Sequence, residues 1–313
     1  MFAYVVRRIL ATVPVMGVVA VFVFALLHLT PGDPAVMIAG DIATEADIAA
    51  IRAKLGLDES LHIQFGTWIG SLLRGDLGIS IFTNLPVTRL IEQRLEPTLA
   101  LTVTTLIVSL AIAIPLGVVA AWKAGTWIDS AVMTFAVLGF SVPVFVLGLV
   151  LILVFSLSLD WLPVQGYTPI RQGFGPFLAN IILPSVTLGV VYAALIARIT
   201  RATMLDVLAQ DYIRTAEAKG LGTGAVLLGH ALKNASVPIV TVVGIGIALL
   251  ISGAIVTETV FAIPGLGRLT VDGILKRDYP IIQGMVLLFS GIYVLINLLV
   301  DLSYMFLDPR IRY

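Results

Sequence analysis

The sequence predicts an all-α integral membrane protein with six transmembrane helices. Hydrophobic residues make up 59% of its 313 residues and charged residues only 12%, whereas soluble proteins average about 45–50% and about 25%. A soluble domain of this length must cover its surface with polar groups, so the surplus apolar side chains must face lipid. A mean hydropathy of +1.05 and six long apolar stretches indicate the same class.

The six stretches each approach the length that a membrane span needs, about 20 helical residues for a hydrocarbon core about 30 Å thick. They are Ile9–Leu29, Thr98–Ala121, Ala131–Leu157, Ile181–Ala197, Val237–Thr257 and Ile281–Tyr304. The first stretch follows Arg7 and Arg8, as a secretory signal would, but a cleavable signal has an apolar core of only about 7–15 residues. We therefore expect the first stretch to be a retained span.

Orientation follows from the positive residues around the first span. Arg7 and Arg8 precede it, and no Lys or Arg occurs from Thr30 to Ile51. Because positive residues favour the cytoplasmic side, we expect a cytoplasmic N-terminus. Six spans return the C-terminus, with Arg310 and Arg312, to the same side. The chain is thus expected to be a multi-pass protein of the cytoplasmic (inner) membrane, embedded in the lipid bilayer.

Four segments are expected on this basis. They are an N-terminal span at 1–30, an extracytoplasmic helical segment at 31–97, the remaining five spans at 98–307 and a cytoplasmic tail at 308–313. The outer segment contains two amphipathic stretches, one after a near capping box at Thr44–Asp47 and one from Leu61 to Leu72. These short helices can pack on the membrane surface or form a platform for a soluble partner outside, and the two interpretations are compatible.

The composition excludes several classes of function. A net charge of +0 provides no basic field for nucleic acid. The chain has no cysteine, and His28, His62 and His230 lie far apart without a ligand spacing such as HExxH, so no metal site is expected. The phosphate-cradling motif GxxxxGK(S/T) is also missing. We therefore expect the chain to have no ATPase motif, no catalytic residue and no bound cofactor of its own.

Two acidic residues fall in or near the predicted spans. Glu258 lies near the outer end of the fifth span and Asp301 toward the inner part of the sixth. Such a carboxylate can serve the transport pathway or couple ions, but a structural role, with hydrogen bonds to a helix end or a neighbouring loop, is favoured. An intramembrane protease is disfavoured because the two acids lie on different spans without a matching motif. Energy for transport must then arrive from elsewhere, or the pathway is passive.

The predicted inner loop, 206–233, contains a short helix from Tyr212 to Lys219. Asp211 is a good cap for its start, and Gly220 is a natural left-handed stop for its end.

Ile213 and Ala216 form an apolar pair on this short helix. Charged residues rim the pair: Arg214, Glu217 and Lys219. An apolar pair with a charged rim suits insertion into the groove of a partner protein. A solvated surface turn with incidental alanines would give the same periodicity, so both interpretations stay open at this point.

Several longer motifs are distributed over nearly the whole chain. They are PGDP at Pro31–Pro34, RGDLGIS at Arg74–Ser80, QDYIRTAEAKGL at Gln210–Leu221, HALKNA at His230–Ala235, ETVFAIPGLG at Glu258–Gly267, RDYP at Arg277–Pro280 and DPRIR at Asp308–Arg312. With this set the chain resembles the inner-membrane permeases, of the B type, of the dipeptide/oligopeptide/nickel ATP-binding-cassette importers.

The resemblance is specific in the inner loop. The wider superfamily has the pattern EAA, three residues and Gly; with Gly220 as the glycine, the triplet falls on Arg214-Thr215-Ala216, where only the last alanine agrees. Glu217 lies three residues too late to be the acid of the motif. Arg-Thr-Ala is the variant that resembles the peptide-importer branch.

The resemblance implies a type I importer fold and a coupling segment that docks on a separate ATPase subunit. That segment comprises Asp211, Tyr212, Ile213, Arg214, Thr215, Ala216, Glu217, Ala218, Lys219, Gly220 and Leu221. The resemblance also implies a second homologous permease, two ATP-binding subunits or domains that use ATP and Mg, and an extracytoplasmic substrate-binding protein.

The function so implied is that of a permease subunit forming half of a pathway for di- and oligopeptides. The same architecture could import nickel, glutathione or another small solute. A stand-alone channel or an ion-coupled carrier is the alternative from another class, and it predicts transport by this chain alone.

Overall fold

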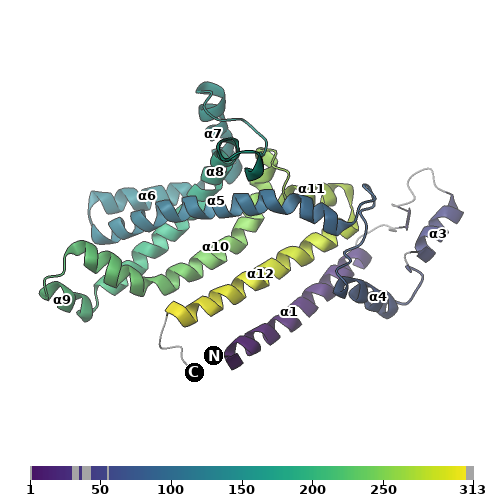
Figure 1. Ribbon diagram of the computed structural model, residues 1–313, viewed down its shortest axis with the longest axis horizontal. Coiled ribbons are helices and arrows are strands. Elements are labelled where there is room, and N and C mark those ends of the chain that lie inside the picture. Colours follow the sequence, from purple (N-terminus) through teal and green to yellow (C-terminus); the bar gives the residue numbers. More distant parts are fainter. Residues whose placement is uncertain (1, 30–34, 37–43, 55, 308–313) are drawn as a thin grey trace. The chain divides into compact units, whose positions relative to one another are not determined.

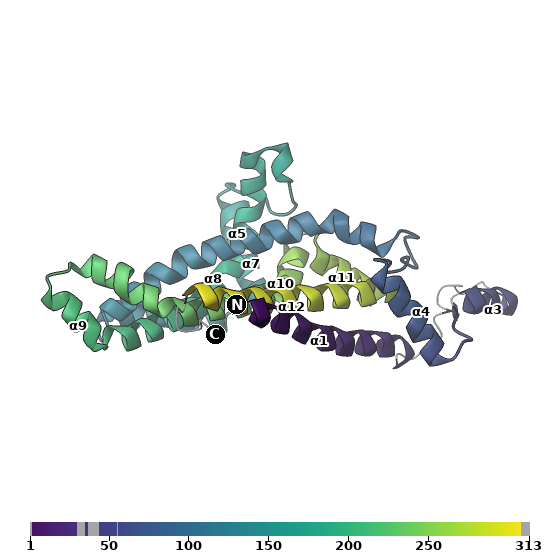
Figure 2. The same cartoon turned by 60° about the horizontal axis from the view of Figure 1, so that its bottom comes forward.

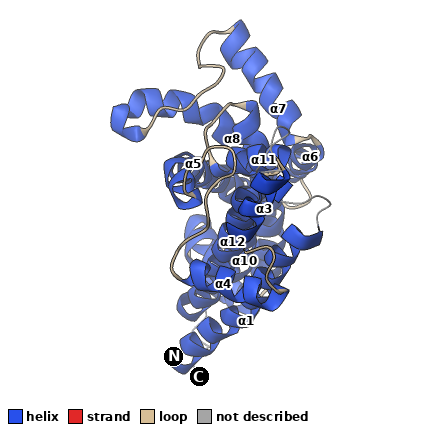
Figure 3. Ribbon diagram, turned by 90° about the vertical axis from the view of Figure 1, so that its right-hand side faces the viewer, coloured by secondary structure: helices blue, strands red, loops and turns tan. Residues whose placement is uncertain are grey.

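The computed structural model describes residues 2–29, 35–36, 44–54 and 56–307, which form helices joined by turns (Figure 3). Within these residues, the β structure is limited to one isolated bridge between Ile79 and Pro86. The all-α prediction is therefore confirmed. The PGDP and DPRIR motifs and the predicted tail lie outside the described residues.

Long apolar helices account for five of the predicted spans. They are α1 (Phe2–Leu29), α5 (Val87–Trp122), α8 (Phe174–Leu208), α10 (Leu232–Val260), which continues the π-helical turn η3 (Ala225–Ala231), and α12 (Tyr279–Leu307). In the described part of the chain, five helical runs are long and apolar enough to cross a membrane, and a bent pair makes a sixth if it crosses once.

The third predicted span is not a single helix, so the prediction of one continuous span at Ala131–Leu157 is wrong. It consists of α6 (Trp127–Ser141), α7 (Val144–Leu151) and the π-helical turn η1 (Ile152–Ser158), and the two arms bend by 102°. Figure 1 shows α7 turning away from the line of α6. Pro143 explains the break, because proline lacks an N–H and forces the preceding residue, Val142, into an extended conformation with ψ 125°.

Shorter helices complete the chain. They are α3 (Glu45–Lys54), α4 (Leu61–Leu73), the 3-10 turn η2 (Ile170–Gln172), α9 (Asp211–Ala218) and α11 (Leu266–Lys276). The helices α3 and α4 lie at the two stretches where short helices were expected between the first and second spans.

The chain divides into two compact units. The first comprises Leu95–Arg268 and Leu295–Tyr313, and the second Phe2–Arg94 and Leu269–Val294. In the first unit α8 is the central helix, in contact with α6, α7 and α10. A small residue also brings α5 close to α8: a Cβ on Gly117 of α5 would lie 2.6 Å from the Cβ of Thr200 on α8. Membrane helices commonly approach one another at such positions.

The second unit is held by a buried polar contact and an aromatic cluster. Ser80 Oγ donates a 2.6 Å hydrogen bond to Asp278 Oδ2, and each residue is 1% exposed. This bond joins the RGDLGIS motif to the RDYP motif. The rings of Phe24, Phe65 and Trp68 pack together with centroids 5.2–6.2 Å apart, which fixes α4 against α1.

Candidate functional site

The short helix α9 lies where α8 and η3 meet, at the left-hand end of both views (Figures 1 and 2). It begins one residue before the predicted start, because Gln210 is the extended cap residue with ψ 146°. Asp211, predicted as the cap, is instead the first helical residue. Its carboxylate still lies in the first turn, where negative charge complements the helix dipole.

The end of α9 is a Schellman motif, as expected for a helix stopped by glycine. Gly220 has φ +82°, so the predicted left-handed stop is confirmed. Its N–H donates to Glu217 O at 2.9 Å, and the N–H of Leu221 donates to Ala216 O at 3.3 Å. These two bonds satisfy carbonyl groups that the helix end would otherwise leave unpaired.

The apolar pair of α9 faces the interior of the chain. Ile213 is 2% exposed and Ala216 is 8% exposed, and Ile213 packs in a hydrophobic cluster with Met204 of α8 and Val226 of η3. The hypothesis that this pair inserts into a partner is therefore corrected. Periodicity identified the apolar face but could not tell whether the chain or a partner covers it.

The opposite face of α9 is exposed. It carries Asp211, Tyr212, Arg214, Thr215, Glu217, Ala218 and Lys219. Tyr212 is 41% exposed, and its hydroxyl accepts a 2.9 Å hydrogen bond from Asn234 Nδ2 of α10. The pair formed by Arg214 and Asp211, 3.5 Å apart, has side chains that are 76% and 98% exposed, so it adds little stability. This face is a polar surface held rigidly by the buried side of the same helix.

Glu258 lies at a buried junction of α5, α10 and the start of α11. It is 0% exposed. Its Oε1 accepts a 2.6 Å hydrogen bond from Thr98 Oγ1, and its Oε2 accepts a 3.0 Å bond from the N–H of Arg268. Thr98 Oγ1 in turn accepts a 2.8 Å bond from the N–H of Leu266. The carboxylate thus accepts hydrogen bonds from a neighbouring helix and from the start of α11.

Two glycines of the ETVFAIPGLG motif make room for this carboxylate. A Cβ on Gly265 would lie 2.1 Å from Glu258 Oε1, and a Cβ on Gly267 would lie 2.6 Å from the Cα of Ile255. The motif is therefore a packing unit around Glu258. Asp301, the other predicted acid, is partly buried near the end of α12.

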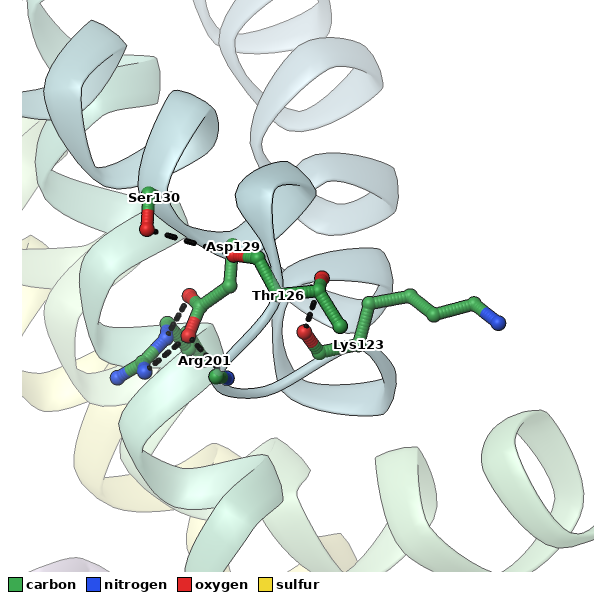
Figure 4. Close-up of polar contacts among 6 residues, drawn as sticks. Lys123, Thr126, Asp129, Ser130 and Arg201 are labelled. Atoms are coloured by element: carbon green, nitrogen blue, oxygen red, sulfur yellow. Dashed lines mark hydrogen bonds and ion pairs between the residues drawn. The ribbon is translucent and has the colours of Figure 1, made fainter.

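Sequence reasoning missed a partly buried ion pair between α6 and α8. Arg201 Nε and Nη2 donate to Asp129 Oδ1 and Oδ2 at 2.5 and 2.7 Å, and the N–H of Gly125 donates to Oδ2 at 3.0 Å. Figure 4 shows the guanidinium facing the carboxylate beside the turn that precedes α6. The available signal was an acid at the start of one apolar run and an arginine at the end of another.

The loop after the bent pair is tied to the end of α10. The N–H of Gly166 donates to Phe261 O at 2.9 Å, and Tyr167 Oη donates to Glu96 Oε1 at 3.4 Å. Burial, followed by the charge and hydrogen bond of Glu96, raises the pKa of Tyr167 to about 12.

As for metals, the described residues contain no group of three His, Cys, Asp or Glu that could hold an ion.

Both parts of the chain match family models. Residues 113–313 match the model described as binding-protein-dependent transport system inner membrane component. Residues 1–102 match the model of the N-terminal part of such membrane components.

Curated relatives match over the full length of both chains. The chain is 56% identical to the probable peptide ABC transporter permease protein y4tP of Sinorhizobium fredii. It is 46% identical to the glutathione transport system permease protein GsiC of Salmonella typhimurium, and 43% identical to a putative peptide transport system permease protein of Brucella abortus. Each alignment covers 100% of this chain and 100% of the relative.

A solved structure has the same fold. The inward-facing MetNI methionine ABC transporter matches with a TM-score of 0.58 at 20% identity, over 71% of this chain and 97% of that chain. The type I importer fold expected from the sequence is therefore confirmed.

Proposed function

The chain belongs to the family of binding-protein-dependent transport system inner membrane components, and from that premise we propose that it forms half of the translocation pathway of a di- and oligopeptide importer. It is a multi-pass permease subunit of the inner membrane. Two of the relatives are named for peptides and one for glutathione, which is itself a tripeptide. These names favour a peptide over nickel as cargo.

The observation that carries the proposal is the difference in exposure between the two sides of α9. Its inner side, with Ile213 and Ala216, is part of the hydrophobic interior, while its outer side is polar and exposed. A helix that is fixed from within and exposed on the other side suits docking in the cleft of a separate ATP-binding subunit. Closure of that subunit would then displace α9 and the helices attached to it.

The complete importer contains further subunits under this proposal. A second homologous permease supplies the other half of the pathway, and two ATP-binding subunits or domains hydrolyse ATP with Mg. A binding protein delivers peptide from the extracytoplasmic side, and α3 and α4 lie in the segment that would receive it. Both termini and α9 are on the cytoplasmic side, as the positive residues before the first span indicate.

Uptake by reconstituted vesicles tests the function. The permease is reconstituted alone or with its second permease, ATP-binding subunits and binding protein, and uptake of labelled di- and tripeptides is measured with and without ATP. We expect uptake only from the complete assembly with ATP. Uptake by this chain alone would instead establish a channel or an ion-coupled carrier.

Single-cysteine cross-linking tests the docking of α9. Because the chain has no cysteine, Glu217→Cys introduces its only thiol, on the exposed side of α9. We expect a cross-link to the ATP-binding subunit. Trp161→Cys is the matched control, because Trp161 is 68% exposed and lies in the loop that precedes α8. Equal cross-linking from both positions would reject the docking.

The outer platform is tested in the same way. Leu61 and Leu73, at the two ends of α4, are 59% and 83% exposed. Cysteines at these positions are expected to cross-link to the binding protein. If neither reacts with the binding protein in the complete importer, the platform role of α4 is wrong and membrane packing remains.

A further inference from the structure

The ion pair between Asp129 and Arg201 joins the start of α6 to the last turns of α8, the helix that leads into α9. Arg201 lies about two turns before the end of α8 at Leu208, and α9 follows directly. Asp129 lies in the first turn of α6, after the turn that joins α5 to α6. Any displacement of α9 along α8 therefore reaches this pair before it reaches the rest of α6.

The geometry of the pair fixes direction as well as distance. Two parallel N–H groups of the guanidinium meet the two carboxylate oxygens at 2.5 and 2.7 Å, and the backbone N–H of Gly125 supplies a third donor. Such a bidentate contact is lost if either helix rotates or slides. A lysine could not replace it, because an ammonium group is a single point of charge.

Burial of the carboxylate makes the pair hard to break. Asp129 is 5% exposed, and the side chain of Arg201 is 26% exposed. Separating the two groups would leave a buried carboxylate short of its strongest donors, at a large cost in free energy. Elsewhere α6 and α8 meet through small residues, with a Cβ on Gly139 only 3.2 Å from the Cβ of Ala194. Such packing brings the helices together but tolerates sliding more readily than the ion pair does.

We propose that Asp129 and Arg201 are positioning residues that force α6 to follow α8 when α9 is displaced, and so couple ATP hydrolysis to movement of the bent pair α6–α7. The inference rests on the proposed docking of α9. Pro143 interrupts the helix after α6, so a pull on α6 changes its angle to α7 instead of moving one rigid rod. Movement of α8 is therefore passed to α6 at the ion pair, and the angle between α6 and α7 changes at Pro143.

The test measures peptide uptake per ATP hydrolysed in the complete, reconstituted importer. Asp129→Asn and Arg201→Lys are compared with the wild type for assembly, for ATP hydrolysis and for uptake. We expect assembly and hydrolysis to persist while uptake per ATP falls by roughly tenfold, within the range of about 5–150-fold that is typical of coupling between sites. The exchanged pair Asp129→Arg with Arg201→Asp should recover part of the ratio.

The matched control is Arg198→Lys. Arg198 is on α8 one turn before Arg201 and is exposed, with no ion pair or hydrogen bond in the described part of the chain, so uptake per ATP should be unchanged. If Asp129→Asn does not assemble, the milder Arg201→Lys decides.

Two results would overturn the proposal. One is an unchanged uptake per ATP in Arg201→Lys, and the other is a loss of assembly in which the surviving complexes keep the wild-type ratio, since that describes a merely structural pair. Failure of the proposed function is seen separately, in the wild type, as uptake by the chain alone or equal cross-linking from α9 and from the control loop.

Discussion

Thr98 and Glu258, 160 residues apart in the sequence, form a continuous chain of hydrogen bonds with the start of α11. Thr98 Oγ1 donates to the carboxylate and accepts from the N–H of Leu266, while the other carboxylate oxygen accepts from the N–H of Arg268. Three helices are thereby joined through one buried acid. The arrangement predicts sensitivity to small changes of shape and of donor number.

Replacement of Glu258 by Gln is expected to destabilise the protein. The amide keeps the size of the side chain but replaces one acceptor oxygen with a donor, so one N–H or hydroxyl loses its partner. Loss of a hydrogen bond to a charged buried group costs about 1.5–3 kcal/mol. Thermal unfolding in detergent measures the effect, and Thr259→Ala is the control, because Thr259 is exposed and its hydroxyl donates only to Ile255 O in the described chain. Unchanged stability with lost transport would indicate a pathway role for Glu258.

Replacement of Gly265 by Ala is expected to destabilise by overpacking. The new methyl group would lie 2.1 Å from Glu258 Oε1, so the carboxylate or the chain must move, at a typical cost of about 1–3 kcal/mol. Gly175→Ala is the matched control, because a Cβ there meets nothing within 4 Å. Unfolding midpoints of both variants are compared. Equal midpoints would mean that the turn at Gly265 relaxes freely.

Replacement of Ser80 by Ala is expected to loosen the second unit. Ser80 Oγ donates to Asp278 Oδ2 and accepts from the N–H of the exposed Thr83, so its removal leaves the buried carboxylate of Asp278 one donor short, at about 1–3 kcal/mol. Trypsin cleavage after the exposed Arg74 should then become faster in detergent. The control is Ser158→Ala, in the other unit and exposed, for which an unchanged cleavage rate is expected.

The two sides of α9 should separate stability from docking. Ile213→Ala removes a buried side chain and should cost about 2–5 kcal/mol of unfolding free energy. Glu217→Ala changes only the exposed side, so it should leave the unfolding midpoint unchanged and weaken co-purification of the ATP-binding subunit. The reverse pattern, with Glu217→Ala destabilising the isolated chain, would contradict the orientation of α9.

Stability at alkaline pH should depend on Tyr167. Its pKa of about 12 lies above the ordinary value of about 10, so the folded protein holds this proton more tightly than the unfolded chain. The resulting stabilisation is complete below pH 10 and is lost as the pH rises to 12. The midpoint of thermal unfolding should therefore fall more steeply with rising pH for the wild type than for Tyr167→Phe. Parallel curves would disprove the linkage.

Hydropathy and helix-ending signals predicted the spans and the end of α9 well. The runs that became α1, α5, α8, α10 and α12 are long and apolar, and each span must satisfy its backbone internally as a helix. Gly220 follows the end of α9 as expected, because the residue there has a left-handed backbone conformation, which glycine adopts readily. These features depend on local chemistry, which a single sequence carries.

Long-range pairing and the direction of apolar faces could not be predicted. An apolar pair on a short helix can be covered by the chain's own interior or by a partner's groove, so periodicity does not tell which of the two covers Ile213. The pairs Asp129–Arg201 and Thr98–Glu258 depend on where helices meet, which periodicity does not specify. The bend at Pro143 was hidden in an unbroken apolar run, since many membrane helices contain proline without a sharp turn.

The internal anchoring of α9 bears on how this importer can diversify. Because Ile213 and Ala216 are held by the chain's own fold, residues such as Arg214, Glu217 and Ala218 can change without refolding the helix. Under the proposed docking of α9, preference for one ATP-binding subunit over a paralogous one can then change through a few substitutions on one short surface. A hybrid importer, in which this permease works with the ATP-binding subunits of a related system, should be obtainable by grafting the related permease's exposed α9 residues onto this chain.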